Sequence, residues 1–126
     1  MDVVAAIIER DGKILICQRK VGQRYAGKWE FPGGKVEPKE EFVAALAREL
    51  EEELGISATI GEEIARYRYT YPRREPIQLI FYQVEQFEGE PVNLIFEQIR
   101  WEEARKLPEY DFLEGDIEFV KRLATG

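Results

Sequence analysis

Residues 30–56, EFPGGKVEPKEEFVAALARELEEELGI, combine a pair of adjacent glycines with a high density of carboxylates. Like charges at helical spacing repel one another, so this crowding within an apolar pattern needs a physical explanation. Clustered carboxylates at the edge of a packed face are costly unless a cation neutralises them, and hard divalent cations take oxygen ligands. The segment therefore indicates either a solvated helix face or a metal site, with Mg²⁺ as the expected ion and Mn²⁺ as the alternative.

A helix is expected over residues 38–54. Pro38 suits a first helical position, and Gly55 suits the residue just past the last turn. The apolar residues of this segment recur at helical spacing and predict one buried stripe. The members of the stripe are Phe42, Val43, Leu46, Leu50 and Leu54.

The acids of this helix divide into two groups. Glu49, Glu52 and Glu53 fall within an arc of about 100° that borders the apolar stripe, whereas Glu51 lies on the far side. Arg48 is placed among the first three and can hold one of them by a charge-assisted hydrogen bond. A charge run taken alone is usually a solvated surface, and the nearby glycines are what favour a metal site instead.

The spacing of the whole segment is specific. From Gly34 it reads Gly, five residues, Glu, seven residues, and then Arg-Glu-Leu-Glu-Glu-Glu-Leu-Gly-Ile, which ends at Ile56. This resembles the Nudix box, Gly-x5-Glu-x7-Arg-Glu-U-x-Glu-Glu-x-Gly-U with U aliphatic, at every fixed position. The preceding KWEFPGGK, residues 28–35, resembles the MutT branch of that family. A motif of this length is far more specific than a lone glycine motif.

The resemblance implies a fold and a reaction. The fold would be an α/β/α sandwich around a mixed β-sheet, with one domain over residues 1–126 and the box at 34–56. A MutT-like enzyme would hydrolyse a nucleoside triphosphate to the monophosphate and pyrophosphate, removing oxidised nucleotides of the 8-oxo-dGTP type from the nucleotide pool. The alternatives are a Nudix hydrolase of another nucleoside diphosphate derivative, such as CTP or methylated dCTP, a sugar nucleotide or a dinucleoside polyphosphate, and a non-catalytic nucleotide sensor.

The resemblance also assigns roles within the box. Arg48 would orient Glu49, and Glu53 is favoured over Glu49 as the group that takes the proton from water. Glu40 would lie behind the ligands or bind a further ion. The expected metal ligands are the Gly33 carbonyl, Glu49, Glu52 and Glu53.

Substrate contacts are expected outside the box. Arg19 matches a family arginine that contacts phosphate, although a surface charge is the plainer interpretation. Trp29, Phe31 and Tyr71 are candidates to sandwich a base, although aromatic residues at strand-like spacing are more often core. Arg74 is expected to reach the base or the phosphates.

The chain departs from the family pattern at one position. Where relatives often carry a further catalytic glutamate there is Ile95, and Glu97 lies two residues later as a candidate replacement and metal ligand. Asp116 falls where relatives use Asn or Asp to contact the base edge. It is equally suited to cap the last helix, so both roles stay open.

The elements that must position these residues can be outlined from the pattern. Short β-like runs flank Asp11-Gly12, which predicts a hairpin, and the polar stretch 20–28 predicts a loop. The order of strands, helix, strands and helix favours a mixed α/β sandwich over a doubly wound sheet. Strands are expected at 3–8, 13–19, 64–71, 77–85 and 99–101, and further helices at 102–106 and 116–124.

Composition limits the remaining function classes. With 44% apolar residues in 126, the chain is expected to form one ordered domain. A net charge of −7 disfavours a nucleic acid polymer as partner, because such binding needs clustered basic residues. The short apolar run near the N-terminus predicts no signal or membrane segment. The single Cys17 predicts no disulfide framework, so a cytoplasmic location is expected. The expected partner is the small nucleotide that the resemblance implies, and the chain is expected to be a monomer or homodimer.

Overall fold

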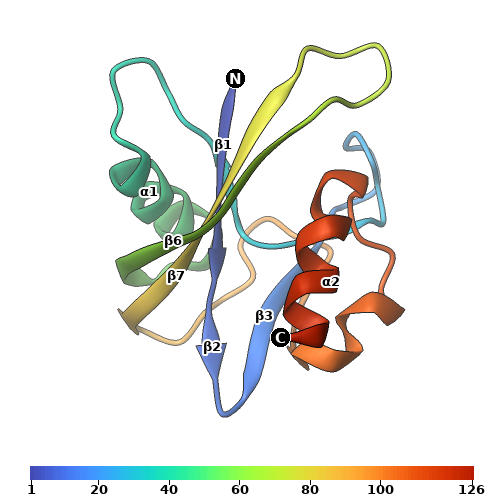
Figure 1. Ribbon diagram of the computed structural model, residues 1–126. Helices are drawn as coiled ribbons and strands as arrows, with labels where there is room; N and C mark the ends of the chain where they lie inside the picture. Colours follow the sequence, from blue (N-terminus) through green and yellow to red (C-terminus); the bar gives the residue numbers. More distant parts are fainter.

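The computed structural model describes residues 1–126 and contains two four-stranded sheets, two α-helices and two short 3₁₀ segments (Figure 1). One sheet has the order β5-β1-β7-β6, and the other is built on β3, which pairs with β2, β4 and β8. The elements are β1 Asp2–Ile7, β2 Glu9–Arg10, β3 Lys13–Gln18, β4 Trp29–Glu30, β5 Gly33–Lys35, α1 Phe42–Leu54, β6 Ser57–Tyr69, β7 Ile77–Glu88, β8 Gln98–Glu103, η1 Ala104–Glu109, η2 Glu114–Asp116 and α2 Ile117–Thr125.

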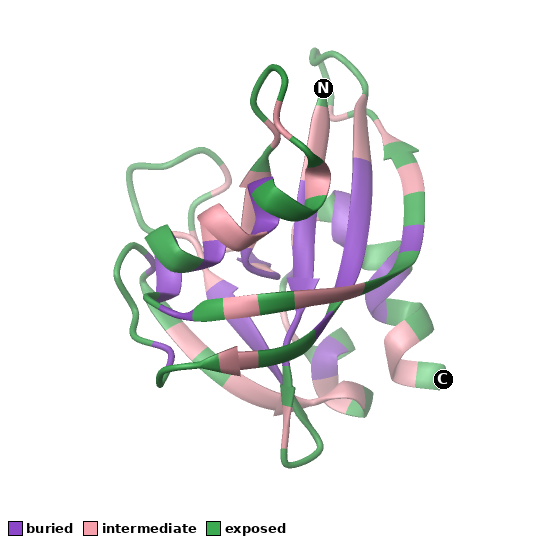
Figure 2. Ribbon diagram, turned by 90° about the vertical axis from the view of Figure 1, so that its left-hand side faces the viewer, coloured by how far each residue is buried: buried purple, intermediate pink, exposed green.

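The first sheet is mixed, because β1 pairs antiparallel with β5 and parallel with β7. Successive residues of β1 point to opposite faces of the sheet. Val4 and Ala6 pack in the core that contains the apolar stripe of α1, whereas Ala5 and Ile7 pack in the core that contains α2. Both faces of β1 are therefore covered, and the middle of the strand is buried throughout (Figure 2). The expected α/β/α sandwich around a mixed sheet is confirmed.

The hairpin expected at Asp11-Gly12 is confirmed. β2 and β3 pair antiparallel, and both turn residues have positive φ, 53° at Asp11 and 78° at Gly12. The helix end expected at Gly55 is also confirmed, because Gly55 is left-handed and donates its N–H to the Glu51 carbonyl at 3.0 Å.

The start expected for the acidic helix is wrong. α1 begins at Phe42, and residues 37–40 form a turn closed by the Glu40 N–H on the Glu37 carbonyl at 3.1 Å. Pro38 occupies the second position of that turn, which its fixed φ also suits, and Lys39 follows with φ 67°. Pro38 therefore belongs to the turn that leads into the helix.

Other boundaries differ in the second half of the chain. β6 begins at Ser57, well before the expected 64. The pattern did not show this start, because irregular pairing with β7 between Thr59 and Ala65 interrupts the alternation of the strand. β8 continues to Glu103, so the helical segment expected at 102–106 begins at Ala104 and is 3₁₀.

Neither α-helix has the length and apolar character needed to span a membrane.

Candidate metal and nucleotide site

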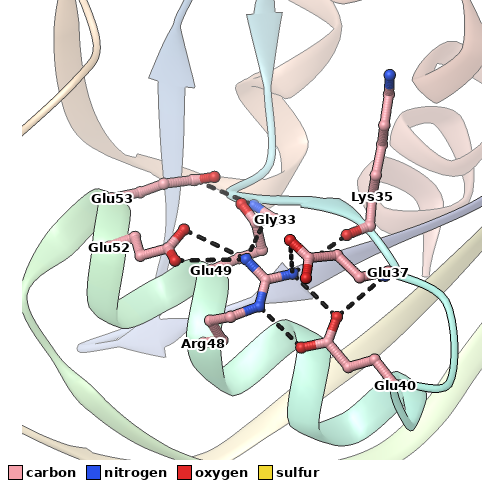
Figure 3. A network of polar contacts seen from close by, with 8 residues as sticks. All are labelled: Gly33, Lys35, Glu37, Glu40, Arg48, Glu49, Glu52 and Glu53. Atoms are coloured by element: carbon pink, nitrogen blue, oxygen red, sulfur yellow. Dashed lines mark hydrogen bonds and ion pairs between the residues drawn. The ribbon is translucent and has the colours of Figure 1, made fainter.

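The acidic face of α1 lies directly against the two glycines of β5. The Gly33 N–H donates to Glu53 Oε1 at 3.2 Å (Figure 3). A Cβ added to Gly34 would lie 2.6 Å from Glu49 Oε2, inside any allowed contact. The bare backbone of Gly34 is therefore what lets Glu49 approach this strand, whereas Glu53 is bound by the Gly33 N–H.

Arg48 connects three of the box acids (Figure 3). Its Nε and Nη2 donate to the two oxygens of Glu40 at 2.8 and 3.0 Å. Its Nη1 reaches Glu49 Oε1 at 3.0 Å and Glu52 Oε2 at 3.3 Å. Arg48 thus contacts Glu49 as expected, and the structure places the Glu40 carboxylate on Arg48 itself.

Exposure varies strongly among the acids of α1. Glu53 is 6% exposed and the Glu49 side chain is 16% exposed, whereas the Glu52 side chain is 58% exposed and Glu51 is a surface residue. Burial is the main cause that raises the pKa of Glu53 far above its ordinary value, and its contact with the Glu49 carboxyl adds to the rise. Glu53 is therefore the group whose ionised form most needs a compensating positive charge.

The donor chemistry of this site fits a hard divalent cation. Glu49, Glu52, Glu53 and the carbonyl of Gly33 offer only oxygen, which Mg²⁺ and Mn²⁺ take as ligand. No three acidic side chains of the chain are gathered around one point, and Glu49 and Glu52 form ion pairs with Arg48. A bound ion would neutralise Glu53 and reverse the rise in its pKa.

The segment between β7 and β8 supports the last turn of α1. The N–H groups of Val92 and Leu94 donate to the carbonyls of Leu54 and Glu53 at 2.9 and 3.2 Å. These bonds satisfy two of the carbonyls that a helix leaves free at its C-terminus. The backbone of Glu53 is therefore fixed from outside its own helix.

A cavity of about 360 Å³ opens beside the glycines and Glu53. This volume is within the range of pockets that hold small ligands. Six of the expected site residues line it, together with other residues to which the sequence analysis gave no role. The expected ones are Arg19, Phe31, Gly33, Glu53, Tyr71 and Asp116, and the others include Tyr25, Glu30, Leu79 and Ile95.

Arg19 lines the cavity in contact with a buried acid. Its Nη1 lies 3.1 Å from Glu30 Oε2, and its Nε donates to the Arg24 carbonyl at 2.8 Å. Burial raises the pKa of Glu30, and Arg19 opposes that rise. The sequence analysis missed Glu30, although an acid between the aromatic residues Trp29 and Phe31 in a short apolar strand was a signal that could have revealed it.

Asp116 also lines the cavity and is 6% exposed. It stands at the N-cap position of α2, but its side chain makes no capping hydrogen bond there. Burial and the charge of Glu30 raise its pKa from 3.8 to about 8. Of the two roles expected for Asp116, the helix cap is therefore not formed, and the carboxyl is free to contact a ligand in the cavity.

The remaining candidates divide between the cavity and the surface. Tyr71 lines the cavity, whereas Trp29 packs edge-on against Tyr110 with ring centroids 5.0 Å apart and does not reach it. Arg74 and Glu97 are exposed and do not line it either. At the position where the family glutamate is absent, Ile95 contributes an apolar side chain to the cavity.

In this α/β/α sandwich an acidic helix packs on a glycine-bearing strand, and the carboxylates of that helix suit metal-assisted hydrolysis. The family model described as the NUDIX domain matches residues 1–123, and the chain belongs to this family. Members of the family generally need a divalent metal ion. The expected resemblance to the Nudix family, with its MutT branch, is confirmed.

Two curated relatives cover nearly the whole chain. A CTP pyrophosphohydrolase of Escherichia coli (strain K12) is 43% identical over 121 residues, 96% of this chain and 89% of the relative. An 8-oxo-dGTP diphosphatase of Haemophilus influenzae is 38% identical over 124 residues, 98% of this chain and 90% of the relative. The crystal structure of a MutT Nudix hydrolase from Burkholderia pseudomallei has a TM-score of 0.84 at 30% identity and covers 95% of each chain.

The raised pKa of Asp116 predicts a pH-dependent stability difference. Below about pH 4 the Asp116 carboxyl is protonated in both the folded and the unfolded chain and does not change the free energy of unfolding. Between about pH 4 and about pH 8 it ionises only in the unfolded chain, so the free energy of unfolding falls as pH rises. Asp116→Asn removes the ionisation and nearly preserves the shape. The free energy of unfolding of this variant relative to the unaltered chain should therefore increase steadily from pH 5 to pH 8, as measured by urea denaturation.

Asp111→Asn is the matched control, because Asp111 is exposed and pairs only with Lys28 at the surface. Its difference from the unaltered chain should stay nearly constant over the same pH range. Parallel stability curves for Asp116→Asn and the unaltered chain would contradict a buried carboxyl that ionises near pH 8.

Proposed function

We propose that the chain is a Mg²⁺-dependent nucleoside triphosphate pyrophosphohydrolase that acts on a modified nucleotide of the 8-oxo-dGTP type. The observation that carries this proposal is that one cavity is lined both by Glu53 of the box with the adjoining Gly33 and by Phe31, Tyr71 and Asp116. The first pair suits the metal and phosphates. The second set offers aromatic faces and a hydrogen-bonding group, which suit a base.

Each box residue then has a defined task. Glu49, Glu52, Glu53 and the Gly33 carbonyl would hold the ion, which supplies positive charge for the phosphates and acidity for a bound water. Glu53 would accept the proton of the attacking water, and Arg48 would keep Glu49 oriented. Water oxygen bonds to the β-phosphorus while the bond from that phosphorus to the α–β bridging oxygen breaks. The products are a nucleoside monophosphate and pyrophosphate.

Arg19 is proposed to contact the phosphates. It lines the cavity, and its present partner Glu30 is itself a cavity residue. Arg74 and Glu97 would need the loops that carry them to move toward the cavity, so we propose both only as contacts of the bound complex.

Asp116 is proposed to contact the base edge. A carboxylate accepts a hydrogen bond from an exocyclic amine, and a protonated carboxyl can also donate one. Exocyclic amines occur on both guanine and cytosine, so a cytosine nucleotide such as CTP or methylated dCTP is the second candidate substrate. The names of the two curated relatives divide along the same line.

The other candidates have less support. Sugar nucleotides and dinucleoside polyphosphates carry a second bulky group, whereas the two curated relatives are named for nucleoside triphosphates. A non-catalytic sensor is disfavoured because every box acid is present. We also propose that the 126 residues work as one domain in the cytoplasm, where a free buried Cys17 is compatible with a reducing environment, as a monomer or homodimer.

A pyrophosphate-release screen with Mg²⁺ tests the proposal. The panel contains ordinary, oxidised and methylated nucleoside triphosphates, sugar nucleotides and dinucleoside polyphosphates. Rapid turnover of one triphosphate, abolished by chelation and restored by Mg²⁺, is the expected result. Turnover of only the last two groups would overturn the triphosphate assignment, and tight nucleotide binding without hydrolysis would favour the sensor.

A further inference from the structure

Three tyrosines at and just beyond the end of β6 bind the two residues that precede Asp116. Tyr67 Oη donates to the Gly115 carbonyl at 2.6 Å, and the Gly115 N–H donates to Tyr71 Oη at 2.9 Å. Tyr69 Oη donates to the neighbouring Glu114 carboxylate at 3.2 Å. The N–H and the carbonyl of Gly115, the residue directly before Asp116, are therefore both bound by tyrosine side chains that lie more than 40 residues away in sequence.

The rings as well as the hydroxyls close on Gly115. A Cβ added there would lie 2.8 Å from Tyr71 Oη and 3.3 Å from the Tyr69 ring. The rings of Tyr69 and Tyr71 are themselves in edge contact, with centroids 4.8 Å apart. The segment is thus held at a distance that only glycine permits at position 115.

The opposite side of this segment is tied to the strand that carries Glu30. The Leu113 N–H donates to the Trp29 carbonyl at 2.9 Å, and the Asp116 N–H closes a turn on the Leu113 carbonyl at 2.9 Å. The Asp116 side chain itself has no hydrogen-bond partner in the protein, although it is nearly buried and lines the cavity. Its position is consequently set by backbone contacts that its neighbours make.

We propose that Tyr67 and Tyr71, through their hydrogen bonds to Gly115, are positioning residues that fix Asp116 for contact with the base and thereby set base selectivity. The proposal rests on the proposed function, since it assigns the base to the part of the cavity that Asp116 lines. Tyr67 acts only through Gly115, because it does not line the cavity. Tyr71 has two tasks, because its hydroxyl holds Gly115 while its ring lines the cavity.

Tyr67→Phe tests this inference. The substitution removes the donor to Gly115 and keeps the ring that packs against Phe81. With the preferred triphosphate of the screen, KM should rise roughly three- to tenfold, the loss expected for one hydrogen bond, while kcat stays within about twofold. The ratio of kcat/KM between that nucleotide and its nearest base analogue should fall by a similar factor.

Tyr110→Phe is the matched control. It removes a donated hydrogen bond of the same length, 2.6 Å to Glu102, and one accepted from Arg100 at 3.2 Å, in a tyrosine that does not line the cavity. It should lower thermal stability to a similar extent and leave the selectivity ratio unchanged. If Tyr67→Phe does not fold, Tyr71→Phe tests the same contact from the other side of Gly115.

A double-mutant cycle decides whether the effect passes through Asp116. In the Asp116→Ala background, Tyr67→Phe should cause little further change in selectivity, because the group that it positions has already been removed. An equal loss in both backgrounds, or a selectivity ratio that changes no more than in Tyr110→Phe, would overturn the inference while the proposed function stands. Failure of the unaltered chain to hydrolyse any triphosphate would overturn both.

Discussion

Glu53→Gln is expected to lower kcat by about 10³-fold, equivalent to about 4 kcal/mol in activation free energy. Glu53 is the most buried acid of the chain's box and contacts the Gly33 N–H, so it is both a proposed ligand and the proposed proton acceptor. Glutamine keeps the shape but cannot carry the negative charge or accept the proton. The loss should appear in pyrophosphate release at saturating Mg²⁺ and nucleotide.

Glu51→Gln is the matched control, because it removes the same charge from the same helix on its exposed side. It should leave kcat within about twofold, since a distant surface charge is largely screened. Thermal stability of Glu53→Gln should be equal to or above that of the unaltered chain, because a buried carboxyl without a neutralising partner is costly. Near-normal turnover in Glu53→Gln would remove this residue from the mechanism.

Gly33→Ala is expected to reduce the free energy of unfolding by about 3 kcal/mol, because overpacking and backbone strain act together. The added Cβ would lie 2.0 Å from the Val4 carbonyl oxygen, and the Gly33 φ of 152° is one that other residues rarely adopt. Since the obstacle is backbone, β5 must move away from β1. Urea denaturation measures the loss, and turnover should fall with it because Glu53 then loses its contact with Gly33.

Gly12→Ala separates the two causes of that loss. Gly12 also has a positive φ, 78°, but an added Cβ would meet nothing within 4 Å. Its cost should be about 1 kcal/mol, the conformational part alone. A loss in Gly33→Ala no greater than in Gly12→Ala would show that close approach of β5 to β1 contributes little.

Local sequence chemistry was sufficient for several elements. The Asp11-Gly12 turn, the helix end at Gly55 and most of the apolar stripe of α1 each depend on residues that are neighbours in the chain. The inclusion of Val43 in that stripe was wrong, because this residue is 45% exposed. The division of acids was predictable in part, since helical geometry placed Glu51 on the outer face and Glu53 on the inner one. Glu52 was expected to lie with Glu53, but its side chain is 58% exposed. The start of α1 was not, because a turn and a helix both favour Pro38.

The parts that sequence reasoning missed depend on distant contacts. Glu30 is buried because β4 joins β3 beside Arg19, and no local pattern shows that pairing. The contact of Tyr67 with Gly115 joins β6 to η2, which are separated in the chain by β7, β8 and η1. Spacing within one segment can identify candidate ligands, but it cannot show which residues of other segments will meet them.

The parallel pairing of β1 with β7 has a consequence for the order of folding. Val3 lies opposite Leu79, so the centre of the sheet forms only after more than half of the chain has been synthesised. Contacts of such long sequence separation slow folding, because the entropy of closing the intervening loop is lost first. The acids of α1 leave the ribosome long before this closure. Until then they stay hydrated and apart, and a nascent chain has no preassembled place for an ion to occupy.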